Sequence, residues 1–241
     1  MSCYKGLSNK SIEILPSDLL TEEVCMAAVE SDGRALKNIP ESMKTETLCL
    51  AALNNAPGNG YADDLIKYIP DKLQTDAVCI TAVTRLGRAL EYIPAKKKSY
   101  AVCLAAVKSE DNKDKKRGEF ILKYVPKKHL TEELCLAAVK TVGETFRDVP
   151  DKIKNLDFCM KIMKINGFLL QYVPKKLMTL EFCREAIKTD GAAFRFAPKE
   201  FLTLDFCIEA MKAPSAYSYG YKIQFVPGDL KEQVEKVLKK K

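Results

Sequence analysis

The chain has 241 residues, of which 47% are hydrophobic and 29% charged, and its formal net charge is +7. Such an apolar chain with nearly balanced charge is not disordered, and the lack of any apolar run of about 18 residues predicts that no segment spans a membrane. The first residues, MSCYKGLSNKS, contain no apolar signal core, so we expect a cytoplasmic protein. In that compartment nine cysteines are not expected to form a disulfide framework.

The chain begins with what reads as half of a repeated unit. Residues 1–20 contain Ile12, Pro16 and Leu19 at positions that recur later, and we predict that this segment is an N-terminal cap.

Cysteine and proline mark the repeat that follows. After Cys3 the cysteines are spaced by 24, 30, 24, 32, 24, 24 and 24 residues, and a proline lies nine residues before each of the eight. Fixed periods of this kind indicate stacked structural units. We therefore predict eight repeats of 24 residues, two of them lengthened before the next cysteine, over residues 21–227.

Each repeat predicts two helices. A capping side chain stands four residues before each cysteine, so a long helix is expected to begin there. Apolar residues before Cys, at Cys and three and four residues later form one stripe, with Ala138 as an example of the small residue at the third position. A glycine such as Gly33 is expected to stop the helix in the left-handed conformation, and a short second helix then runs to the proline. The caps are Thr21, Thr45, Thr75, Ser99, Thr131, Asn155, Thr179 and Thr203.

Three repeats are longer between their two helices. The insertions cover about Asn55–Asp64, Ser109–Gly118 and Ala213–Tyr221. Insertions on one edge of a repeat stack either mark a binding face or are merely tolerated there. The third favours binding because Tyr217 and Tyr219 supply rigid contact area.

Residues 228–241, GDLKEQVEKVLKKK, predict a C-terminal capping helix with Leu230, Val234, Val237 and Leu238 on one face. A pair of short helices cannot bury its apolar stripe alone, so the repeats must stack. We predict an all-α protein, a single α-solenoid domain over residues 1–241 with a right-handed superhelix.

A resemblance supports this fold. The strings TEEVCMAAVESDGRALKNIP, TEELCLAAVKTVGETFRDVP and TLEFCREAIKTDGAAFRFAP resemble the microbial repeat family catalogued as domain of unknown function 4116. The resemblance covers about residues 12–227 and implies a helical repeat protein without a particular activity. The regular cysteine and proline depart from the family's pattern.

The sequence offers little for catalysis, metal binding or a cofactor. The cysteines lie between apolar neighbours, where Cys behaves as a small hydrophobic residue, and no CxxC pair occurs. His129 is the only histidine, and P-loop, GxGxxG, GxSxG and HExxH motifs do not occur. We expect a protein that is not an enzyme and holds no cofactor or metal.

Charge is distributed unevenly. Residues 1–94 contain 9 Lys and Arg against 13 Asp and Glu, whereas residues 95–241 contain 30 against 19. In the basic part, Lys108, Lys140, Lys164 and Lys188 occupy the fifth position after Cys. Such a ladder is typical of a solvated face, of a surface for an acidic protein, or of a nucleic-acid surface.

Aromatic residues form a second column two positions before proline, including Tyr124 and Tyr172. They serve either packing between repeats or contact with a ligand. We predict a scaffold that binds another protein, one with an acidic surface, through Lys108, Lys140, Lys164, Lys188, Tyr124, Tyr172, Tyr217 and Tyr219. The alternatives are binding of nucleic acid or another anionic polymer by the same lysines, and a structural subunit of a larger assembly.

Overall fold

The computed structural model describes residues 9–16, 19–57, 65–109 and 121–239, and these residues form helices and turns without strands. The chain divides into two compact units, Met1–Leu130 and Thr131–Lys241, and each is described by itself. The first holds repeats one to four and the second holds repeats five to eight. The single domain and the right-handed superhelix stay predictions, and most of the first two predicted insertions (58–64 and 110–118) lies outside the described residues.

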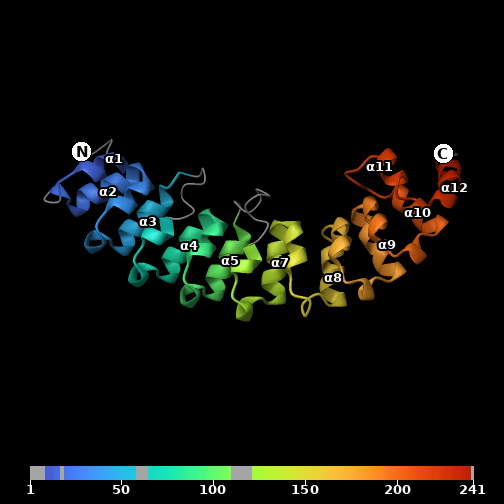
Figure 1. The fold of residues 1–241 in the computed structure, drawn as a ribbon, viewed down its shortest axis with the longest axis horizontal. Coiled ribbons are helices and arrows are strands. Elements are labelled where there is room, and N and C mark those ends of the chain that lie inside the picture. The colour runs from blue at the N-terminus through green and yellow to red at the C-terminus, as the bar shows by residue number, and fades with distance from the viewer. Residues whose placement is uncertain (1–8, 17–18, 58–64, 110–120, 240–241) are drawn as a thin grey trace. The chain divides into compact units, whose positions relative to one another are not determined.

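The predicted long helices are confirmed, and within each unit they lie side by side in chain order (Figure 1). In all eight repeats the predicted capping side chain accepts a hydrogen bond from the backbone N–H three residues later, as the Thr21 hydroxyl accepts one of 3.3 Å from the N–H of Val24. The long helices are α2 (Glu22–Ser31), α3 (Glu46–Asn54), α4 (Asp76–Arg85), α5 (Tyr100–Lys108), α7 (Glu132–Thr141), α8 (Leu156–Met163), α9 (Leu180–Thr189) and α10 (Leu204–Lys212).

In the first seven repeats the second segment is a 3-10 helix that ends just before the proline, whose preceding residue is forced into extended backbone, and in the eighth repeat it is the α-helix α11 (Tyr219–Ile223). A further 3-10 turn follows most of the prolines. The second segments are η2 (Gly33–Asn38), η4 (Leu65–Tyr68), η6 (Gly87–Tyr92), η9 (Ile121–Tyr124), η11 (Gly143–Asp148), η12 (Gly167–Tyr172) and η14 (Gly191–Phe196). The turns are η3 (Glu41–Met43), η5 (Asp71–Leu73), η7 (Ala95–Lys97), η10 (Lys127–His129), η13 (Lys175–Leu177) and η15 (Lys199–Phe201).

The expected left-handed glycine is wrong at Gly33 and at Gly167, which lie outside that region of φ. The helix before Gly33 ends in extended backbone at Asp32, with φ −153° and ψ 108°. Glycine is needed for close approach instead, since a Cβ on Gly33 would lie 2.0 Å from the carbonyl oxygen of Ala52, and one on Gly167 would lie 1.8 Å from that of Ala186. Both alanines occupy the small position three residues after Cys in the next repeat, so two small residues set how closely repeats stack.

The cores of the two units differ in their side chains. The largest fully buried residues of Thr131–Lys241 include Phe146, Phe158, Phe182, Phe194 and Phe206, whereas Met1–Leu130 fills its core with aliphatic residues such as Leu36, Leu48, Ile66 and Leu90. Cysteine is common to both cores. All eight described cysteines are buried, as expected for small hydrophobic residues.

Helices cover the ends of the chain. At the start, α1 (Asn9–Ile14) packs against η2 and buries Ile12. In the eighth repeat α11 (Tyr219–Ile223) begins within the predicted insertion and ends two residues beyond it, and α12 (Gly228–Lys239) packs against α10. Val234 is buried, Leu230 and Leu238 are half-buried, and Val237 is exposed, so the predicted apolar face is narrower than its sequence pattern.

Candidate binding face

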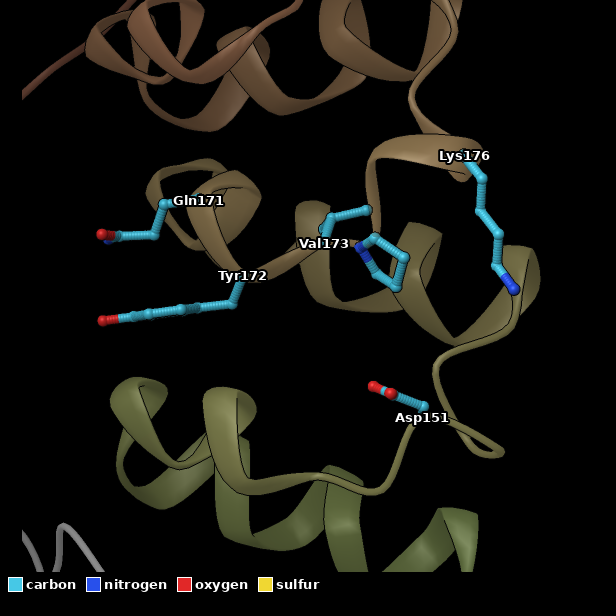
Figure 2. Close-up of a pocket in the computed structure, with 6 residues that line it drawn as sticks. Asp151, Gln171, Tyr172, Val173 and Lys176 are labelled. Carbon is cyan, nitrogen blue, oxygen red and sulfur yellow. The ribbon is translucent and has the colours of Figure 1, made fainter.

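The proline turns form a hollowed edge in the second unit. A cleft of 330 Å³ lies where repeat five meets repeat six, and its lining residues are Asp151, Gln171, Tyr172, Val173, Pro174 and Lys176. In Figure 2 the side chains of Gln171 and Tyr172 extend in the same direction from the end of η12, and Asp151 lies on the other side of Val173, on the turn after the preceding repeat's proline. We call this the Tyr172 cleft.

An equivalent cleft occurs one repeat later. It has a volume of 490 Å³ and is lined by Lys175, Met178, Phe196, Ala197, Pro198, Lys199 and Glu200. Phe196 corresponds to Tyr172 and Lys175 corresponds to Asp151, each 24 residues on. We call it the Phe196 cleft. The aromatic column and the lysines that follow proline, which are separate features of the sequence, are therefore brought to the same clefts.

The walls of both clefts carry opposite charges. Among the described residues no ion pair joins Asp151 to Lys176 or Lys175 to Glu200, although each pair lines one cleft. The side chain of Tyr172 likewise makes no hydrogen bond or ring contact with any residue that the structure describes. The charged side chains and the ring of the Tyr172 cleft are available to a ligand, whereas the Gln171 amide donates a hydrogen bond of 3.3 Å to the carbonyl of Phe168.

The equivalent residues of the first unit contact one another. Asp71 and Lys96, which correspond to Asp151 and Lys176, form an ion pair of 2.7 Å, and the hydrogen bond from Lys96 holds the pKa of Asp71 below its usual value. The Lys67 amine lies 3.8 Å from the centre of the Tyr92 ring. In the first unit the acidic group and the aromatic ring therefore have partners within the protein, whereas the equivalent groups of the second unit, Asp151 and Tyr172, do not.

Tyr124 is half-buried and is also engaged within the first unit. Its backbone carbonyl accepts a hydrogen bond of 3.0 Å from Lys98, and the Lys123 amine lies 4.6 Å from its ring centre. A hydrogen bond from the Tyr124 hydroxyl lowers the pKa of Glu91. Of the two predicted aromatic contact residues, Tyr172 and not Tyr124 faces a cleft without a partner.

The lysine ladder lies on the long helices, away from the residues that line the two clefts. Lys108, Lys140, Lys164 and Lys188 are all exposed near the ends of α5, α7, α8 and α9. Lys188 forms an ion pair of 2.6 Å with Glu185, which holds the pKa of that carboxyl below its usual value. Part of the ladder's charge is therefore neutralised within its own helix.

Tyr217 and Tyr219 lie in the eighth repeat and are 37% and 44% exposed. Tyr217 stacks on Tyr221, with ring centres 4.5 Å apart, and on Phe168, with ring centres 5.3 Å apart. Phe168 also meets Phe196 edge to face at 5.1 Å. Repeats six, seven and eight thus contribute to one group of rings, whereas Tyr219 makes no ring contact with any residue that the structure describes.

Arg195 lies among these rings. Its guanidinium carbon is 4.4 Å from the ring centre of Phe196, 5.0 Å from that of Phe225 and 5.1 Å from that of Phe168. Tyr221 is also close, and its hydroxyl accepts a hydrogen bond from one guanidinium nitrogen. We call Phe168, Arg195, Phe196, Tyr217, Tyr221 and Phe225 the Arg195 cluster.

Sequence reasoning missed a set of buried lysines. Lys222 is 4% exposed, and its amine donates to the carbonyl oxygens of Ala210, Met211 and Ala213 at 2.8–3.0 Å. The amine thereby provides hydrogen-bond donors for carbonyl groups at the C-terminal end of α10 and holds the insertion against this helix. Burial lowers the pKa of Lys222. Lys44 donates across repeats to the carbonyl of Tyr68 at 2.7 Å. Lys222 and Lys44 occupy different positions of the repeat. At each of these positions several other repeats have an apolar residue, such as Leu169 for Lys222 and Leu130 for Lys44, and this is the one signal in the sequence that the side chain faces inward.

The cysteines are poorly suited to nucleophilic chemistry or metal binding. Burial raises the pKa of Cys135 and Cys159 to about 11, so both thiols remain protonated at neutral pH. No cluster of potential metal ligands occurs among the described residues. Within the same residues, none of the helices combines the length and the apolar character that crossing a membrane requires.

Comparison with known proteins identifies one family. The model of the family described as Domain of unknown function (DUF4116) matches residues 131–178, which cover repeats five and six and the Tyr172 cleft. The resemblance noted from the repeated strings is thus confirmed over that segment. Neither a curated protein nor a solved structure gave a significant match to the chain.

Proposed function

We propose that this chain is a non-enzymatic protein-binding module whose proline edge in repeats five to seven holds an extended segment of a partner. The observation that carries the proposal is the Tyr172 cleft and its equivalent one repeat later. Clefts repeated at a regular interval suit a ligand that is itself regular along its length, and a polypeptide is such a ligand.

The chemistry of the clefts favours a peptide over a nucleic acid. Each cleft presents an aromatic ring, a proline and groups of both charge signs, one of each in the Tyr172 cleft and two lysines with one glutamate in the Phe196 cleft. A phosphate backbone would approach Asp151 or Glu200 as well as the lysines, which weakens the counterion release on which polyanion binding depends. A polypeptide offers apolar side chains for the rings and both charges for the walls.

Selection from a displayed library of random peptides tests the proposal. The full chain is immobilised, the peptides that the native protein retains are sequenced, and each enriched family is then tested for binding to the Tyr172→Ala variant. We expect related peptides to be enriched, and we expect labelled single-stranded DNA to show no binding in the same buffer at low salt.

Lys140→Ser is the matched control, because Lys140 is exposed in the same unit and lies outside the residues lining both clefts. The proposal is wrong if no peptide family is enriched, or if the selected peptides bind Tyr172→Ala as well as the native protein. DNA binding that requires the lysine ladder would replace it with the polyanion alternative.

A further inference from the structure

The charge of Arg195 is not neutralised within the structure. No carboxylate forms an ion pair with it among the described residues, although other arginines do have such partners, as Arg184 has Glu209 at 3.0 Å. The nearby Asp190 is engaged elsewhere, because it accepts hydrogen bonds from the Ser215 hydroxyl at 2.6 Å and from the Ala192 N–H at 2.9 Å. A half-buried guanidinium without a counter-ion is a place where an anion would be stabilised.

Arg195 keeps part of its donor set free. Tyr221 takes one of the two terminal nitrogens, and no described residue accepts a hydrogen bond from Nε or from the other terminal nitrogen. Neither atom is buried away from solvent. These two nitrogens lie on one edge of the planar group and form the fork that binds the two oxygens of a carboxylate.

The rings around Arg195 indicate which groups of a ligand would lie beside its anionic group. Tyr217 and Phe225 are 37% and 36% exposed, so the free edge of Arg195 is flanked by apolar surface that solvent reaches. Phe196 belongs both to the Arg195 cluster and to the Phe196 cleft. A chain that lies in that cleft therefore passes beside the guanidinium.

The charge of the site matches a carboxylate better than a phosphate. The amine of the neighbouring Lys222 donates to three carbonyl oxygens, so it offers no further hydrogen to a ligand. One guanidinium balances the single charge of a carboxylate, whereas a phosphate monoester carries nearly two charges and three acceptor oxygens.

We propose that the Arg195 cluster binds a Glu or Asp side chain of a partner peptide, with an aromatic or aliphatic neighbour of that residue packed on the exposed rings. This inference rests on the proposed function and specifies the chemistry of the peptide at one point of the binding face. It replaces the lysine ladder with Arg195 as the residue that recognises an acidic partner.

Fluorescence anisotropy with a defined probe tests the inference. The probe is a fluorescein-labelled peptide of twelve residues built from Phe-Glu-Gly units, and its matched forms carry glutamine or phosphoserine in place of glutamate. We expect the glutamate peptide to bind the full chain and the glutamine peptide to bind at least about tenfold more weakly, because the guanidinium then loses its charged partner.

Three variants distinguish recognition from a structural role. Arg195→Lys keeps the charge but removes the fork and is expected to weaken binding about tenfold. Tyr221→Phe removes only the hydroxyl that orients the guanidinium and is expected to have a smaller effect in the same direction. Arg184→Lys is the control, because Arg184 is already paired with Glu209, and it is expected to bind as the native protein does. Circular dichroism of each variant verifies that it is folded.

The inference is overturned if the glutamine peptide binds as tightly as the glutamate peptide, or if folded Arg195→Lys binds as the native protein does. Tighter binding of the phosphoserine peptide would also overturn it, since the site would then be one for phosphate. If library peptides depend on Tyr172 while Arg195→Lys has no effect, this inference fails and the proposed function stands. If they depend on neither residue, both fail.

Discussion

The first unit, Met1–Leu130, and the second, Thr131–Lys241, place the same columns of residues at the proline edge but use them differently. In the first unit Asp71 pairs with Lys96, and Lys67 lies over the ring of Tyr92. In the second unit Asp151 and Lys176 line a cleft without pairing, and Tyr172 lies beside them without a ring or hydrogen-bond partner among the described residues. Residues that recur at the same position of every repeat therefore need not share a function. A single side chain of the neighbouring repeat decides whether a charged or aromatic group has a partner within the protein or is open to a ligand.

The same comparison also shows what the two units share. Both units start their long helices with a hydroxyl or amide cap, and both bury four described cysteines at the same position. The predictions below test whether the cores behave alike while the proline edges differ.

The largest effect is expected at alkaline pH. Burial raises the pKa of Cys49 and Cys183 from 9.0 to about 11, so the folded chain keeps protons that the unfolded chain loses. The contribution of these thiols to the free energy of unfolding is fully present below pH 9 and is lost as the pH rises from 9 toward 11. Because both units contain such thiols, we expect the helical circular dichroism of the whole chain to be lost in one step in this range.

Cys159→Ala is expected to reduce the alkaline loss, since it removes one of these thiols. Two separate steps, with one unit unfolding first, would show that the cores are not alike, and a chain that stays helical above pH 11 would contradict the role of the thiols in alkaline unfolding. Rapid reaction of most thiols at neutral pH would contradict their burial.

Gly167→Ala is expected to lower the free energy of unfolding by about 3 kcal/mol, because the new Cβ would overlap the carbonyl of Ala186 in the next repeat. Gly33→Ala in the first unit should cost a similar amount. Gly143→Ala is the control within the second unit, since its nearest contact would be an ordinary 3.5 Å from the Leu169 side chain. Urea denaturation measures all three, and equal effects at Gly143 and Gly167 would contradict the close approach.

Ala138→Leu is expected to cost about 1–3 kcal/mol, since Ala138 is 1% exposed at the small position of α7 and a larger side chain overpacks it. The neighbouring Ala137 is half-buried, so Ala137→Leu should cost less. The same urea experiment compares them. An unchanged midpoint for Ala138→Leu would mean that this position does not lie between helices.

The smallest effect concerns the ion pair that distinguishes the first unit. The carboxyl of Asp71 is expected to titrate below its usual range in an NMR experiment, and Lys96→Ala should return its pKa to the ordinary value. Global stability should not change measurably, because both side chains are largely exposed. If the pKa of Asp71 is the same in the native chain and in Lys96→Ala, this ion pair does not distinguish the two units.

Much of the fold follows from the sequence because it depends on local rules. The caps, the apolar stripe and the proline fix where each helix begins and ends, and Cys25 and its equivalents are buried as predicted. Gly33 is different. Its role depends on how closely the next repeat approaches, which no single repeat encodes, so close packing was mistaken for a left-handed turn.

The candidate site was predictable only in part. The sequence identifies Tyr172 as a member of a column and Tyr217 as part of an insertion. Whether a column member is covered depends on side chains 20 or more residues away, as Lys67 is from Tyr92. Arg195 was outside every predicted column, and its significance comes from rings contributed by three repeats. Lys222 appears as an ordinary surface lysine until three carbonyls are found around its amine.

The most direct test of the open cleft is a calorimetric titration of one library-selected peptide into the native chain, Tyr172→Ala and Tyr92→Ala. The two tyrosines occupy equivalent positions, one beside an open cleft and the other under Lys67. We predict that Tyr172→Ala weakens binding by about tenfold or more and that Tyr92→Ala leaves the affinity unchanged. Equal loss in both variants, or loss in Tyr92→Ala alone, would contradict the distinction between the two units.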